Sequence, residues 1–137
     1  MGIFSLFRRE IKYEDFVKKA NKYDNWFQRN KAIQIMNMAV NQPFTNREIS
    51  SGFIYLGILY SKIKDYGMAS DCYNKAFELV VKENFNYHPN FKKAIETFIK
   101  SGDQDRAEYW LDNLLQRQIY DKKYKKLNDF KSKINNV

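Results

Sequence analysis

The side chains that most often carry catalysis are scarce in this chain. It has one histidine, His88, directly before Pro89, and one cysteine, Cys72. A cysteine with no second histidine to activate it is a poor nucleophile, and one cysteine and one histidine cannot build a structural zinc site. There is no glycine-rich phosphate loop, and Asp103 and Asp105 suit helix caps and solvated faces. The sequence therefore predicts a non-enzyme with no catalytic residue, no metal site and no cofactor.

Positive charge is the second chemical feature. The 137 residues include 24 Lys and Arg against 16 Asp and Glu, a formal net charge of +8. A basic surface speeds association with acidic proteins, nucleic acids or anionic membranes. Much of the excess lies between Arg117 and Lys133, where it could form a partner-facing patch or belong to a solvated terminal helix whose dipole it complements. The candidate patch comprises Lys122, Lys123, Lys125 and Lys126.

Composition indicates a globular, helical chain. It is 44% hydrophobic and 17% aromatic, with five glycines and two prolines, which favours long helices over many short strands. No apolar run approaches the roughly 18 residues of a transmembrane span. The N-terminus has its positive charges after the apolar residues, so we expect no secretory signal. A single cysteine cannot form an internal disulfide, and we therefore expect a cytoplasmic protein.

A pattern of aromatic and small residues occurs three times. Its first aromatic residues, Phe16, Phe53 and Phe91, are 37 and 38 residues apart (53 − 16 and 91 − 53). A period in this range, built from paired amphipathic segments, is typical of helical solenoids. The three copies are Phe16, Ala20, Tyr23, Ala32, Met36 and Ala39; Phe53, Gly57, Tyr60, Ala69, Tyr73 and Ala76; and Phe91, Ile95, Phe98, Ala107, Leu111 and Leu114.

Helices with clear start and stop signals must carry these residues. Thr45 and Glu48 form a capping box, and Ser101-Gly102-Asp103 combines a glycine that ends one helix with an aspartate that caps the next. Pro89 suits the first turn of a helix. We expect helices near residues 13–24, 28–40, 45–62, 65–81, 89–100, 103–117 and 121–134.

The middle copy resembles a tetratricopeptide repeat (TPR). Small residues at Gly57, Ala69 and Ala76 would let two antiparallel helices approach, while Tyr60 and Tyr73 fill the space around them. The resemblance implies an all-α, TPR-like right-handed superhelix of three helix-turn-helix repeats. They form one domain, 1–137, with repeats at about 13–44, 45–83 and 89–119, a short N-terminal segment and a C-terminal capping helix at 121–134. The spacings exceed the family's usual length of about 34 residues, and the outer copies are degenerate.

In proteins of this family, the first helices of the repeats line a concave groove that holds a partner peptide or helix. One subset clamps the carboxylate tails of chaperones. Val17, Tyr55 and Pro89 stand where that clamp has other residues, and only Asn21 and Lys93 fit it, so we expect a different ligand. The groove implied by the resemblance comprises Val17, Asn21, Asp24, Ile54, Ile58, Ser61, Lys92, Glu96, Ile99 and Lys100.

The expected function is binding to another protein or peptide, of acidic character. The chain would act as an adaptor, or as a bacterial immunity protein that inhibits a cognate toxin. The alternative is nucleic-acid binding through the basic terminal segments, although most aromatic residues fall on positions that demand burial and few remain to stack on bases. The apolar residues within 3–9 could touch a membrane; we favour instead a cap over the first repeat.

Overall fold

The computed structural model describes residues 11–135, and within them every regular element is helical. The all-α class is therefore confirmed. The N-terminal segment expected at residues 3–9 lies outside the described residues. The elements are α2 (Tyr13–Asn25), α3 (Arg29–Ala39), α4 (Asn46–Lys62), α5 (Tyr66–Leu79), α6 (Asn90–Lys100), α7 (Gln104–Gln116), the 3-10 segments η1 (Arg117–Ile119) and η2 (Lys122–Leu127), and α8 (Phe130–Asn135).

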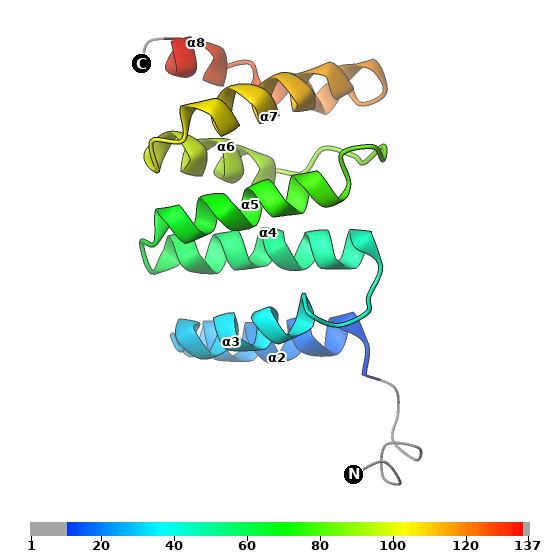
Figure 1. Cartoon of the computed structure of the whole chain (residues 1–137), viewed down its shortest axis with the longest axis vertical. Coiled ribbons are helices and arrows are strands. Elements are labelled where there is room, and N and C mark those ends of the chain that lie inside the picture. Colours follow the sequence, from blue (N-terminus) through cyan, green and yellow to red (C-terminus); the bar gives the residue numbers. More distant parts are fainter. Residues whose placement is uncertain (1–10, 136–137) are drawn as a thin grey trace, which may run out of the picture.

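The helices form a stack in which each α-helix from α2 to α7 packs against the next one in the chain (Figure 1). In addition, α4 contacts both α2 and α6. At the upper end of Figure 1, η2 and α8 lie against α7. Within residues 11–135, no helix has the length and the apolar character needed to cross a membrane.

The same turn joins α2 to α3, α4 to α5 and α6 to α7. In each turn one residue has a positive φ: Phe27 at 59°, Lys64 at 65° and Gly102 at 77°. The backbone N–H of the next residue bonds to a carbonyl five residues before it, over 2.8 to 2.9 Å, in the pairs Gln28 to Tyr23, Asp65 to Tyr60 and Asp103 to Phe98. A left-handed residue with this 6→1 bond is the Schellman way of ending a helix.

Small residues bring α4 and α5 together, as expected. Gly57, Ala69 and Ala76 are all buried. A Cβ built at Gly57 would lie only 2.7 Å from the ring of Tyr73, which is fully buried. Glycine is therefore required where the two helices approach.

Of the helix N-caps predicted at Thr45 and Asp103, the first is confirmed and the second is wrong. Thr45 and Glu48 form the expected reciprocal capping box at the start of α4. Asp103 stands at the N-cap position of α7, but its side chain caps no backbone N–H. Its carboxylate instead accepts a hydrogen bond from Ser70 and lies 3.0 Å from the guanidinium of Arg106. The expected cap is thus replaced by a contact between α5 and α7.

The C-terminal segment is the main departure from expectation. The single helix predicted at 121–134 is divided into η2 and α8. Tyr124, Leu127 and Phe130 are buried at three-residue intervals, and this spacing lines up on one face of a 3-10 helix rather than an α-helix. The prediction that these residues face inward is therefore confirmed, and the prediction of one continuous α-helix is wrong.

Candidate binding groove

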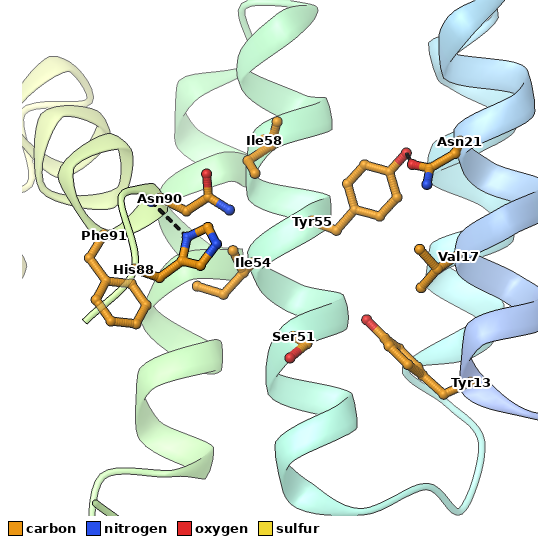
Figure 2. A pocket seen from close by; sticks show the side chains of 10 residues that line it. All are labelled: Tyr13, Val17, Asn21, Ser51, Ile54, Tyr55, Ile58, His88, Asn90 and Phe91. Carbon is orange, nitrogen blue, oxygen red and sulfur yellow. Dashed lines mark hydrogen bonds between the residues drawn. The ribbon is translucent and has the colours of Figure 1, made fainter. Parts of the chain in front are cut away.

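The larger of two neighbouring cavities, about 430 Å³, opens between α2, α4 and the start of α6 (Figure 2). Its walls are mainly apolar, with Val17 from α2, Ile54 and Ile58 from α4, and Phe91 from α6. Polar groups are placed around these walls, so a ligand would find apolar contacts with a few hydrogen-bonding positions. The lining residues are Tyr13, Val17, Asn21, Ser51, Ile54, Tyr55, Ile58, His88, Asn90 and Phe91.

Two tyrosines stand on the α2 side of this cavity. Tyr55 reaches across from α4 and donates its phenolic hydrogen to Oδ1 of Asn21 (Figure 2). Burial, with a smaller contribution from Asp24, raises the pKa of Tyr55 to about 12. Burial and the nearby carboxylate of Glu48 likewise raise the pKa of Tyr13 to about 12. Both phenols therefore remain neutral at physiological pH.

His88 enters the cavity from the irregular segment between α5 and α6. Its Nδ1 accepts a hydrogen bond of 3.0 Å from the backbone N–H of Asn90 (Figure 2). The sequence predicted an exposed turn residue, and His88 is indeed exposed, but it also contributes to the cavity wall.

Arg117 anchors the segment that carries His88. Its guanidinium donates to the carbonyl of Glu83 at 2.7 Å and to that of Val81 at 2.9 Å, and it lies 3.9 Å from the ring centre of Phe85. Only 7% of Arg117 is exposed. Charge-assisted hydrogen bonds of this kind are stronger than neutral ones, so the arginine fixes a segment that has no regular structure of its own.

The C-terminal residues hold the same segment at two further points. The hydroxyl groups of Tyr120 and Tyr124 both donate to the carbonyl of Phe85. The carboxylate of Asp121 accepts from the backbone N–H groups of Tyr87 and Lys123, and these bonds lower its pKa. The cavity wall at His88 therefore depends on residues more than thirty positions away in the sequence.

A second cavity, of about 250 Å³, lies beside the first and shares Ile58 with it. Three lysines and one glutamate give it a positive balance. Of these lysines, Lys62 is paired with Asp24 at 2.7 Å, and Lys100 lies 5.3 Å from the ring centre of Tyr66. The lining residues are Ile58, Ser61, Lys62, Tyr66, Tyr73, Lys93, Glu96, Thr97 and Lys100.

Most of the groove residues implied by the resemblance lie in these two cavities. Val17, Asn21, Ile54 and Ile58 line the first, and Ile58, Ser61, Glu96 and Lys100 line the second.

The other three line neither cavity. Asp24 is occupied by ion pairs with Lys62 and Arg29. Ile99 packs against the core cluster that α6 and α7 share, and Lys92 is half-buried.

The basic patch residues Lys122, Lys123, Lys125 and Lys126 are all exposed on η2. Tyr124 and Leu127, which alternate with them, are buried, so η2 presents its lysines away from the core. Lys126 lies 5.8 Å from the ring centre of Tyr87.

Of the residues considered for catalysis, His88 lines the first cavity, whereas Cys72, Asp103 and Asp105 line neither cavity of the groove. Cys72 is buried on α5, and burial raises the pKa of its thiol to about 12, so little thiolate exists at neutral pH. Asp103 is engaged with Ser70 and Arg106. Among residues 11–135, no group of three or more His, Cys, Asp or Glu residues is placed to hold a metal ion.

Sequence reasoning missed six residues of the first cavity: Tyr13, Ser51, Tyr55, His88, Asn90 and Phe91. The repeat pattern places Phe91 in the core, and in the structure this residue belongs both to the core and to the cavity wall. Tyr55 is on α4 next to Ile54, and its position in the TPR pattern was the available signal. His88 had no local signal, because long-range hydrogen bonds bring its segment to the groove.

Comparison with known proteins does not assign this chain to a family. No protein-family model matches the sequence, and no curated protein matches it. The case for a function therefore rests on the chain's own residues: an apolar cavity between α2, α4 and the start of α6, and beside it a basic cavity lined by α4, α5 and α6.

Proposed function

We propose that this chain is a non-enzymatic protein-interaction module with a TPR-like right-handed superhelix of three helical hairpins. It binds an acidic partner protein or peptide through the groove formed by α2, α4 and α6. It works in the cytoplasm as an adaptor, or as a bacterial immunity protein that neutralises a cognate toxin.

The turns between paired helices support the three-hairpin arrangement. The left-handed residues Phe27, Lys64 and Gly102 are 37 and 38 positions apart (64 − 27 and 102 − 64), which is the period of the sequence pattern. The backbone bonds that close these turns repeat with them. A structural period that coincides with a sequence period is what a repeat architecture predicts.

The two neighbouring cavities, which share Ile58 in their walls, are the observation on which the binding proposal depends. Together they offer apolar walls at one end and lysines at the other. A short helix or extended segment with apolar anchors followed by acidic residues would match this order. The formal net charge of +8 also favours an acidic partner, because opposite charges accelerate encounter.

A pull-down from the native host tests the groove directly. Ile58→Arg would put a charge where the two cavities meet, so capture of the main partner should be lost. The matched control is Met38→Arg, which adds the same charge on α3 at a side chain that is 55% exposed. Equal capture by the two variants would reject the groove as the binding site.

The identity and affinity of the captured partner separate the two roles. An immunity protein should bind one partner tightly, and the adjacent gene should encode a larger secreted protein. An adaptor should bind peptides weakly and through the groove alone. Titration calorimetry with the captured protein measures this difference.

Nucleic-acid binding remains the second candidate because η2 carries four exposed lysines, two on each side of Tyr124. In that case affinity should fall steeply with salt, as counterions are released from the phosphates. Lys125→Glu with Lys126→Glu should abolish it, whereas Ile58→Arg should leave it unchanged. A salt-independent interaction that survives the double lysine change would exclude this candidate.

A further inference from the structure

The turn between α2 and α3 exposes two adjacent aromatic side chains. Trp26 is 71% exposed and Phe27 is 79% exposed. The equivalent positions are Ile63 and Lys64 in the next turn and Ser101 and Gly102 in the third. Large apolar side chains placed together on a protein surface mark sites of contact with a partner or a membrane.

The backbone of Phe27 is also strained. Its φ of 59° lies in the left-handed region, where glycine is at ease and a residue with a bulky side chain is strained. Within residues 11–135 the Phe27 ring remains largely uncovered, and the guanidinium of Arg29 lies 5.1 Å from its centre. Folding alone therefore gives no reason for phenylalanine at a position that glycine would occupy with less strain.

Cationic residues flank the α2–α3 turn and the α4–α5 turn. Asp24 binds Nζ of Lys62 at 2.7 Å and Nε of Arg29 at 3.3 Å, and so ties the α4–α5 turn to the α2–α3 turn. The two turns lie on the same side of the stack (Figure 1). Lys22 and Lys64 are also exposed and have no ion-pair partner within the described part of the chain.

The α4–α5 turn also carries an exposed apolar residue, Ile63, which is 41% exposed. We call Trp26, Phe27 and Ile63, with the cations Lys22, Arg29, Lys62 and Lys64, the aromatic tip. These four cations outnumber the two carboxylates nearby, Asp24, which pairs with Lys62 and Arg29, and Asp65, which accepts the backbone N–H of Met68. The tip therefore combines exposed apolar side chains with a net positive charge.

We propose that the aromatic tip docks on an anionic lipid surface. Tryptophan and phenylalanine partition into the headgroup region of a bilayer, and lysine and arginine are drawn to anionic headgroups. A fluid interface accepts protruding rings without a complementary pocket, whereas a protein partner must supply one. The tip shares Lys62 with the second cavity, but the proposal does not depend on the ligand of the groove.

Vesicle binding by the full chain provides the test. Co-sedimentation should show partition onto vesicles of phosphatidylcholine with phosphatidylglycerol, and much weaker partition onto phosphatidylcholine alone. Raising the salt concentration should weaken it. Trp26 is a built-in probe, because the other tryptophan, Trp110, is 2% exposed and bonded to Asn74. The fluorescence emission of Trp26 should shift to the blue on binding and be quenched by brominated lipid.

Two substitutions separate lipid binding from folding. Phe27→Gly should raise the urea midpoint, because it relieves the left-handed strain, yet lower vesicle partition by about tenfold through lost apolar contact. Trp26→Ser should lower partition similarly. Tyr109→Ser, at another exposed aromatic residue (58%), should leave co-sedimentation unchanged.

The N-terminal residues need their own control, because Phe4 and Phe7 are also apolar. Phe4→Ser with Phe7→Ser should leave partition at the level of the unchanged chain. Three results would overturn the proposal: no binding to anionic vesicles, equal binding after Phe27→Gly and Trp26→Ser, or loss of binding only with the Phe4 and Phe7 changes. The first result would point to a protein partner for the tip.

Discussion

Replacing Gly57 by alanine would place a methyl group 2.7 Å from the ring of Tyr73. An unobstructed glycine-to-alanine change inside a helix stabilises a protein by about 1 kcal/mol, whereas an added methyl in a packed interior costs about 1–3 kcal/mol. Tyr73 is fully buried and meets Phe98 edge-on at 6.5 Å, so its ring has little room to retreat. We expect a net loss of up to about 2 kcal/mol, equivalent to about 6 °C in Tm for a chain of this size.

Urea unfolding followed by far-UV circular dichroism measures this loss. Gly67→Ala is the matched control, because a Cβ there meets only Oδ1 of Asp65, at 3.9 Å; it should be neutral or stabilising by up to about 1 kcal/mol. Adding Tyr73→Leu to Gly57→Ala should reveal favourable coupling, since the smaller side chain vacates the space that the new methyl needs. If Gly57→Ala stabilised the chain as much as Gly67→Ala, the close approach of α4 and α5 would be refuted.

Three further changes probe other parts of the molecule. Thr45→Ala removes the capping box of α4 and should cost about 1 kcal/mol in the same urea assay; no change would show that the cap is irrelevant to stability. Arg117→Ala leaves the carbonyls it binds without their donor, so it should destabilise the chain by about 2 kcal/mol or more and speed amide exchange in residues 80–89, whereas unchanged exchange would refute its anchoring role. At alkaline pH, the raised pKa values of Tyr13, Tyr55 and Cys72, each about 12, mean that the unfolded state loses these protons first. Their stabilising effect is complete below the ordinary pKa values of 9 to 10 and is lost as pH rises toward 12. The urea midpoint should therefore fall between pH 9 and 12. A constant midpoint would contradict the burial of these groups.

Features of the fold that depend on local sequence were predictable. Gly102 marks a helix end because it tolerates a positive φ, and Thr45 with Glu48 marks a helix start. The C-terminal segment was harder to predict. Residues spaced like Tyr124 and Leu127 suit an α-helix or a 3-10 helix, and long-range contacts with Phe85 accompany the second form.

The candidate groove was predictable only in part, for a similar reason. Val17 and Ile58 follow from their places on the first helix of each pair, and both line a cavity. His88 belongs to the cavity because Arg117 anchors its segment from a distance. Asp24 was expected to face the ligand but pairs with Lys62, since a burial pattern does not reveal which charges neutralise each other.

The two ends of the stack are supported unequally. At one end η2 and α8 brace α7, whereas at the other end α2 and α3 rest chiefly on α4 within residues 11–135. Thermal opening should therefore begin at this less supported hairpin. A ligand bound between Val17 and Ile58 would contact both the α2–α3 hairpin and α4. Binding should therefore reduce local opening of this hairpin without changing the backbone conformation.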